Sequence, residues 1–277
     1  MKKIVIIGCG LIGGSFAALA KENDCSVHGI GRREVPLSNA KENQLIDSYS
    51  LDLEPSIIEN SDYIIIASPI STVIPIIETL TNTFKKTLKI IEFSSVKSFL
   101  NHPIVQDSHH QVIAAHPMGG SDVQGLENAS SEILRNRSMI VFDDNQEINK
   151  FFELLSFQCI HCESFEIHDQ WMSHISHGPY LISTLLPAIL SKYEKNYLEQ
   201  LKQVSAGGFR DTTRVSNSPI EWGLDILNGN QNQITTLIDD VMDQLSTIKK
   251  HLTESNNNEL TELLSNAKNT RQTIVSQ

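Results

Sequence analysis

Short apolar runs recur along the first part of the chain and predict the strands of a sheet. Residues 4–7 are all apolar and β-branched, as in a strand that is buried on both faces of a parallel sheet. Between such runs, residues 15–21 and 70–79 have the apolar spacing of helices. Strands that alternate with helices predict an α/β fold with a Rossmann-type, doubly wound parallel sheet. The other strand-like runs cover residues 27–30, 63–67, 88–93, 112–115 and 138–142.

The pattern changes near residue 166, where apolar residues three and four positions apart replace the strand-like runs. We therefore expect an α/β domain over residues 1–165, followed by an all-α C-terminal domain over residues 166–277. Residues 167–192 predict a long helix that is interrupted at Gly178-Pro179 and at Pro187, because proline lacks the amide hydrogen that a helix interior uses.

A later helix carries an apolar stripe on one face, and residues 255–258 break this helix and can cap the next one. The stripe is buried either inside the domain or against a second subunit, and we predict a homodimer. Its members are Leu237, Val241, Leu245, Ile248 and Leu252.

Composition and charge narrow the function classes. The chain has 277 residues, 40% of them hydrophobic, which suits a globular protein of one or two domains. Its 22 Lys and Arg against 33 Asp and Glu give a net charge of −11, which disfavours general binding to nucleic acid or anionic lipid. No apolar run reaches the roughly 18 to 20 residues of a membrane span, and a strand pattern follows the N-terminus at once in place of a cleavable signal. We expect a cytoplasmic protein with no nucleic-acid or membrane partner and with four reduced cysteines.

A glycine-rich turn, Gly8-x-Gly10-x-x-Gly13, lies between the first predicted strand and the first helix. In this position the first glycine permits a tight turn, the second lets the backbone approach a pyrophosphate, and the third lets helix and strand pack closely. The free amides at the helix N-terminus add a partial positive charge. We predict a dinucleotide site that also includes Leu11 and Ile12, together with Ser68 and Pro69 after the strand at residues 63–67.

The residues after the second predicted strand indicate which dinucleotide binds. An acidic residue there would accept hydrogen bonds from the adenosine ribose and repel a 2′-phosphate, but this chain has Gly31-Arg32-Arg33. Two guanidinium groups can hold a 2′-phosphate through charge-assisted hydrogen bonds. We therefore predict NADP as the preferred cofactor, with NAD possible because Glu34 follows directly.

Three segments carry candidate chemistry. Residues 94–97 (Ser-Ser-Val-Lys) and residues 116–120 (His-Pro-Met-Gly-Gly) each follow a predicted strand, where loops face the cofactor crevice of such a sheet. The third segment, residues 207–214, is a polar loop with two arginines in the helical part.

Read together with the glycine-rich turn, these segments resemble the ordered motifs of the prephenate and arogenate dehydrogenases of tyrosine biosynthesis. The resemblance extends from residue 1 to about residue 230. It is carried by Gly8-Cys9-Gly10-Leu11-Ile12-Gly13-Gly14-Ser15, Ser95-Val96-Lys97, His116-Pro117-Met118-x-Gly120, His168-Asp169, Ser176-His177-x-Pro179 and Gly208-Phe209-Arg210-Asp211-x-Thr213-Arg214.

The resemblance implies oxidative decarboxylation of a cyclohexadienol with hydride transfer to a nicotinamide. We interpret His116 as the base, because imidazole titrates near the working pH and can accept the hydroxyl proton. Ser95 is predicted to align the reacting hydroxyl with that imidazole. We assign a substrate carboxylate to the planar fork of Arg214, with Arg210 as the reserve candidate. Lys97 is interpreted as a support for the loop.

The resemblance also places His177 in the substrate cleft and gives His168 a supporting role. Many prephenate-using members have a histidine where this chain has Tyr180, so we assign Tyr180 to substrate binding while the side chain of the substrate, pyruvyl or alanyl, stays open. A metal site built on His168, His174 and His177 is disfavoured, because no carboxylate or cysteine completes a ligand set. The predicted site holds no metal.

Two other functions stay open on the sequence. One is an imine or 2-oxo acid reductase with the same two-domain plan, which would not release carbon dioxide. The other is a non-catalytic protein that senses NADP and controls a partner through its helical part.

Overall fold

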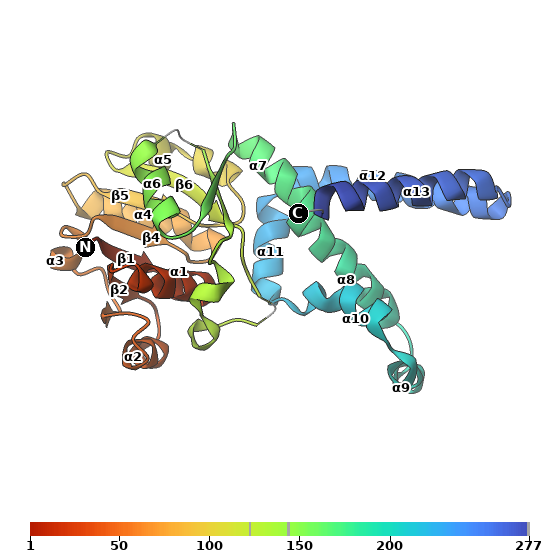
Figure 1. Ribbon diagram of the computed structural model, residues 1–277, viewed down its shortest axis with the longest axis horizontal. Coiled ribbons are helices and arrows are strands. Elements are labelled where there is room, and N and C mark those ends of the chain that lie inside the picture. The colour runs from red at the N-terminus through yellow and green to blue at the C-terminus, as the bar shows by residue number, and fades with distance from the viewer. Residues whose placement is uncertain (122, 143–144, 276–277) are drawn as a thin grey trace. The chain divides into compact units, whose positions relative to one another are not determined.

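The computed structural model describes residues 1–121, 123–142 and 145–275, and the first part of the chain is built around an eight-stranded sheet (Figure 1). The strand order is β3-β2-β1-β4-β5-β6-β7-β8, and all neighbouring strands are parallel except β6 and β7. This arrangement confirms the predicted doubly wound sheet and adds one antiparallel pair. The strands are β1 (Lys3–Ile7), β2 (Ser26–Ile30), β3 (Ser48–Ser50), β4 (Tyr63–Ile66), β5 (Lys89–Glu92), β6 (Gln111–Pro117), β7 (Ser138–Val141) and β8 (Gln158–His161).

Helices cover both faces of this sheet because the buried strands are apolar on both sides. On β1, Ile4 and Ile6 belong to one hydrophobic cluster, whereas Val5 and Ile7 belong to another on the opposite face. The first cluster is closed by α1, α2 and α6, and the second by α3 and α4. These helices, with the short α5, are α1 (Leu11–Glu22), α2 (Glu34–Glu42), α3 (Pro55–Ile58), α4 (Ile70–Thr83), α5 (Pro103–Gln106) and α6 (Gln146–Leu154).

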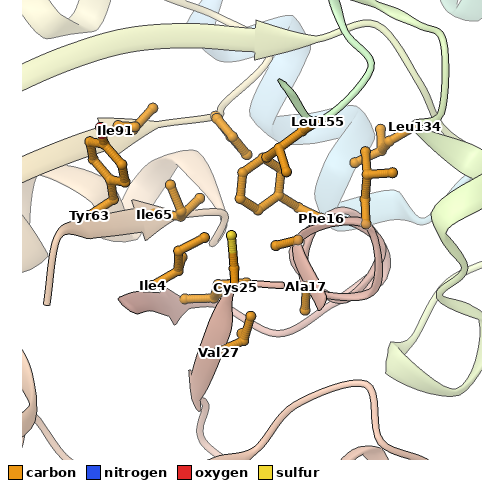
Figure 2. Packing of buried hydrophobic residues seen from close by; sticks show 14 of the residues in the cluster. Ile4, Phe16, Ala17, Cys25, Val27, Tyr63, Ile65, Ile91, Leu134 and Leu155 are labelled. Carbon is orange, nitrogen blue, oxygen red and sulfur yellow. The ribbon is translucent and has the colours of Figure 1, made fainter. Parts of the chain in front are cut away.

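Phe16 on α1 is the centre of the first cluster (Figure 2). Its ring meets Phe93 edge to face at 5.0 Å and stacks on Phe157 at 6.3 Å. Such aromatic pairs add roughly 1 kcal/mol each beyond the area that they bury. Because Phe16 lies three residues after Gly13 of the glycine-rich turn, this packing holds the first turns of α1 against the sheet.

The long helix predicted over residues 167–192 changes its hydrogen-bond pattern once but does not end. It consists of α7 (Phe165–Met172), a π-helical turn (Ser173–His177) and α8 (Gly178–Leu190), so in place of the interruption predicted at Gly178-Pro179 the structure has a π-helical turn just before Gly178. The predicted interruption at Pro187 is wrong, because α8 continues through this residue. Pro187 lies one turn from the helix end, where its missing amide hydrogen removes one backbone hydrogen bond without ending the helix.

The helices α9 (Lys195–Val204), α10 (Gly207–Thr213) and α11 (Ile220–Gly229) complete the compact unit that spans Met1–Gln231. A second unit, Asn232–Gln277, consists of most of α12 (Gln231–Thr253) and of α13 (Asn257–Val275). Residues 254–256 separate these two helices, so the predicted break falls at Ser255 and Asn256, whereas Asn257 and Asn258 already belong to α13. Asn256 accepts a hydrogen bond from the amide of Glu259 at 3.4 Å. None of the helices in the described part of the chain is long and apolar enough to cross a membrane.

Candidate active site

The carboxyl ends of β1 and β4 meet at the point where the strand order reverses, and the glycine-rich turn lies there. Gly8 has a φ of +98°, and a Cβ at this position would lie 2.7 Å from the carbonyl of Ala67 and from the amide nitrogen of Ser68. Only glycine adopts this conformation without strain and fits this contact. The predicted cofactor residues Gly8 and Ser68 are therefore neighbours.

The other two glycines differ in what surrounds them. A Cβ on Gly13 would lie 2.3 Å from the carbonyl oxygen of Gly8, so the turn and α1 are packed against each other. A Cβ on Gly10 would meet no atom within 4 Å. Gly10 precedes the first helical residue Leu11, and no side chain caps this helix N-terminus. The turn thus offers free amides beside open space, which fits a dinucleotide pyrophosphate.

The adenosine end of such a cofactor would meet the residues after β2. Arg32 and Arg33 are exposed there, and neither guanidinium forms an ion pair with any residue that the structure describes. Glu34 is directed towards the hydroxyl of Tyr49, which lies 3.5 Å from its carboxylate. Both cations are therefore free to bind an anion.

The loop after β4 is held by hydrogen bonds from α4, which follows it, and to α11, which lies far along the chain. Ser68 accepts a hydrogen bond from the Thr72 hydroxyl at 2.8 Å, and Pro69 precedes the first residue of α4. The amide of Ile70 donates to the carboxylate of Asp225 on α11 at 3.1 Å. A helix from the all-α part thereby caps α4 beside the cofactor turn.

A chain of three side chains leads to the predicted base. His116 is near the end of β6, and its Nδ1 lies 2.9 Å from Nε2 of His168 on α7. His168 Nδ1 lies 2.7 Å from the carboxylate of Asp169. His116 is half-buried, and its Nε2 has no hydrogen-bond partner within the described ranges. The structure thus brings His116 and His168 together, 52 residues apart in the chain.

Asp169 also anchors the loop after β5. Its carboxylate accepts hydrogen bonds from the backbone amides of Lys97 at 2.9 Å and Ser98 at 2.8 Å. The ammonium group of Lys97 is fully buried and pairs with the equally buried Glu92 at 2.5 Å. A buried ion pair of this kind fixes geometry more than it adds stability. These contacts hold the segment that carries Ser95, as the prediction of a supporting role for Lys97 requires.

The second buried histidine of this region is His177, at the end of the π-helical turn. The side-chain amide of Asn230 donates to the backbone carbonyl of Asp169 at 2.7 Å and to Nδ1 of His177 at 3.1 Å. Since Nδ1 is the acceptor, the hydrogen of neutral His177 is on Nε2. The backbone of Ser95 lies near enough to affect the pKa of His177, but Nε2 has no partner of good hydrogen-bond geometry among the described residues.

Burial controls the protonation of these histidines. It holds the pKa of His116 well below its usual value, and the charges of His168, Lys97 and His177 act in the same direction. Burial also lowers the pKa of His168, and it lowers that of His177 to about 4. All three rings are therefore neutral at pH 7, and His116 is in the form that can accept a proton.

The remaining predicted residues lie on the helices after the π-helical turn. Arg210 on α10 and Arg214 at the following turn (Arg214–Asn217) are exposed, so their contact with a substrate carboxylate stays a prediction. Tyr180 packs edge to face on Trp222 at 5.1 Å. Its hydroxyl oxygen would lie 2.1 Å from a Cβ on Gly223, so the ring is fitted closely against α11.

The sequence did not predict that Asp169, Asn230 and Glu92 take part in this hydrogen-bond network. The position of Asp169 directly after His168 could have suggested its role, whereas no local pattern marks Asn230 or Glu92. His168 has both ring nitrogens engaged and His174 is exposed. In the part of the chain that the structure describes, no group of three His, Cys, Asp or Glu side chains is arranged to hold a metal ion.

Comparison with known proteins places this site in a family. Residues 16–158 match the family model of the prephenate dehydrogenase nucleotide-binding domain, and residues 164–266 match that of the prephenate dehydrogenase dimerization domain. A prephenate dehydrogenase of Lactococcus lactis is 30% identical over 260 residues, which cover 92% of this chain and 70% of the relative. A cyclohexadienyl dehydrogenase of Zymomonas mobilis is 27% identical over 259 residues, which cover 90% of this chain and 87% of the relative.

Solved structures of arogenate and prephenate dehydrogenases are also similar to this chain. The arogenate dehydrogenase of Synechocystis has a TM-score of 0.79 and 26% identity, with 99% of this chain and all of that chain covered. A prephenate dehydrogenase of Aquifex aeolicus was solved with hydroxyphenyl propionate and NAD+, and it has a TM-score of 0.85 at 21% identity. The match covers 99% of this chain and 98% of that chain, and it shows a similar fold. Two matching family models and a relative of this identity leave one assignment: the chain belongs to the prephenate dehydrogenase family.

Proposed function

We propose that this oxidoreductase converts prephenate or arogenate to the corresponding 4-hydroxyphenyl product, with loss of carbon dioxide and with NADP as the preferred acceptor. The observation that carries the proposal is His116, a neutral imidazole at the carboxyl end of β6 whose Nδ1 is engaged and whose Nε2 is not. Relatives named prephenate, cyclohexadienyl and arogenate dehydrogenase support the substrate class.

The chemistry needs one proton acceptor and one means of holding the ring carboxylate. His116 Nε2 accepts the proton of the ring hydroxyl, and the oxygen becomes a carbonyl as hydride leaves the same carbon. When bound, the nicotinamide takes up that hydride. The C–C bond to the ring carboxylate then breaks, carbon dioxide departs, and the electron pair makes the ring aromatic with a phenolate oxygen. Protonated His116 returns its proton to this oxygen, so the base is restored in each cycle.

The other groups orient the substrate. The Ser95 hydroxyl has no hydrogen-bond partner among the residues that the structure describes, so it is available to the reacting hydroxyl. Nε2–H of His177 is a buried donor that an oxygen of the substrate would satisfy. We assign the substrate carboxylate to Arg214, with Arg210 in reserve and with Tyr180 on the wall of the cleft.

The preference for NADP rests on Arg32 and Arg33, two exposed guanidinium groups beyond β2 with no acidic residue between them and the strand. NAD lacks the 2′-phosphate that they would bind, so it would gain nothing from either group. Glu34 does not neutralise them, since it is directed towards Tyr49.

We also propose a homodimer. Four large apolar side chains on α12 are exposed, and Met242, Leu245 and Leu252 are each 58% exposed or more. The second unit has too few residues to bury them itself, and the matched dimerization-domain model covers most of it. The fourth is Ile238.

A crossed assay tests the function. Reduced nicotinamide and carbon dioxide would be measured with prephenate or arogenate against NAD or NADP. We expect equal amounts of both products with one of the substrates, faster with NADP. A reductase of imines or 2-oxo acids would release no carbon dioxide, and a cofactor-sensing protein would bind NADP without turnover.

The same assay tests the base. His116→Asn should lower turnover by about 10² to 10⁴, the usual range for a general acid–base group, with cofactor affinity unchanged. His161→Asn is the matched control, because His161 is exposed at the end of β8. An unaltered rate in His116→Asn would remove this residue from the mechanism.

A further inference from the structure

We propose that Asp169, acting through His168, is a positioning residue that keeps His116 in the tautomer with hydrogen on Nδ1 and the lone pair on Nε2. The inference rests on the proposed function only in taking His116 as the base. The proposed function takes Nε2 of His116 as the accepting atom because Nδ1 is engaged. The inference adds which nitrogen holds the hydrogen and which residues determine this.

Asp169 is surrounded by groups that donate hydrogen bonds to its carboxylate. Two of them are the backbone amides of Lys97 and Ser98, which can only donate. Burial alone would raise the pKa of Asp169, but the hydrogen bonds from His168, Ser98 and Lys97 outweigh it and lower the pKa below its usual value. Asp169 is therefore an ionised carboxylate at pH 7, and it can act only as an acceptor towards His168.

That acceptor determines the tautomer of His168. Its Nδ1 lies 2.7 Å from the carboxylate and must donate, so the hydrogen of the neutral ring is on Nδ1 and its Nε2 holds a lone pair. This Nε2 lies 2.9 Å from Nδ1 of His116. Of the two nitrogens at that contact, only His116 Nδ1 can supply the hydrogen.

The opposite arrangement is disfavoured at both contacts. A hydrogen on His116 Nε2 would leave lone pairs facing each other across 2.9 Å, unless the His168 ring also changed its tautomer. The ring would then turn a lone pair towards the carboxylate at 2.7 Å. Since His168 is fully buried, no water replaces the lost hydrogen bonds. The relay thus keeps Nε2 unprotonated and ready for the substrate hydroxyl.

The first test is a measurement on the unaltered protein. The ¹⁵N chemical shifts and two-bond couplings of ¹⁵N-histidine protein, assigned to His116 by comparison with His116→Asn, report which ring nitrogen holds the hydrogen. We expect hydrogen on Nδ1 of His116 at pH 7. Hydrogen on Nε2 would overturn the inference whatever the enzyme turns over, and a protein that oxidises neither prephenate nor arogenate would leave this test intact.

The second test removes the acceptor. His168→Phe keeps the ring volume beside Phe142 and leaves Asp169 with its two backbone donors, but His116 loses its partner. Turnover should fall by roughly tenfold to a thousandfold with little change in the KM for substrate, since an unconstrained base spends time in the wrong tautomer. The ¹⁵N spectrum should then show both tautomers of His116.

A rescue and a control separate this role from packing. In His168→Gln the amide oxygen can accept from His116 Nδ1, so part of the lost turnover should return and the His116 spectrum should approach that of the unaltered protein. His174→Phe, an exposed histidine in the π-helical turn, should leave turnover and spectrum unchanged. A His168→Phe protein with full turnover, or a Gln variant no better than Phe in turnover and tautomer, would contradict the inference.

Discussion

Acidification should destabilise this protein through the buried His177. Burial is the main cause that lowers the pKa of this residue from 6.5 to about 4 in the folded state. The unfolded chain therefore binds a proton at a higher pH than the folded chain does, and acid favours unfolding. The stabilising effect of the neutral ring is complete above pH 6.5 and is lost as the pH falls from there towards 4.

The size of this effect follows from the shift. Each unit of pKa difference corresponds to about 1.4 kcal/mol, so the full contribution is about 3 kcal/mol. About 2 kcal/mol of it is lost between pH 7 and pH 5, because His177 is protonated in most unfolded molecules at pH 5 and in few folded ones. That is a large part of the 5 to 15 kcal/mol that stabilises a typical domain.

Urea unfolding at pH 7 and at pH 5, at one protein concentration, measures the loss. His116 and His168, whose pKa values are also lowered, change stability in the same direction, so the difference between variants isolates His177. His177→Gln should be less stable at pH 7, but it should lose about 2 kcal/mol less than the unaltered protein on going to pH 5. His174→Gln, exposed in the same π-helical turn, should lose as much as the unaltered protein. Equal losses for His177→Gln and the unaltered protein would refute the reasoning.

Three further predictions concern the glycine-rich turn and the two arginines after β2. Gly10→Ala should cost at most about 1 kcal/mol of stability and weaken NADP binding at least tenfold, because its methyl group meets no protein atom but enters the space for the pyrophosphate. Gly13→Ala should cost about 1 to 3 kcal/mol in thermal unfolding, because its methyl group meets the backbone of Gly8; similar behaviour of the two variants would contradict this. Replacing both Arg32 and Arg33 with Ala should weaken NADP binding about tenfold to a hundredfold in calorimetry and leave NAD binding nearly unchanged, and equal losses would show that neither arginine reads the 2′-phosphate.

The sheet was predictable because its signals are local. The run at residues 4–7 alternates between two buried faces, and the glycine-rich turn lies directly between a predicted strand and a predicted helix, the context in which its spacing is informative. The strand β3 escaped prediction, since Ser48–Ser50 has no apolar run. The predicted interruption at Pro187 was wrong because the rule against proline applies to helix interiors, whereas Pro187 lies only one turn before the end of α8 and removes a single backbone hydrogen bond.

The candidate site was predictable only in part, because its contacts are not local. The resemblance pointed to His116 and Ser95 through motifs, but the carboxylate of Asp169 reaches the amides of Lys97 and Ser98 across more than 70 residues of chain. Such a contact leaves no periodicity in the sequence. A buried carboxylate is a sign of such partners, yet burial of Asp169 is known only once α7 is placed.

The polar network under the site also explains why Glu92 and Lys97 are buried at all. A buried ion pair is rarely more stable than apolar side chains of the same size, but loss of one partner typically costs about 3 to 5 kcal/mol. Here the pair lies on the segment that turns from β5 towards Ser95, and the amide of Lys97 is bound by Asp169. The same residue therefore ties the Ser95 loop to the carboxylate that orients His168. A shift of either partner would move the Ser95 hydroxyl and the proposed base His116 together. The proposed reaction at one C–OH group requires this alignment of a side chain in the loop after β5 with one on β6.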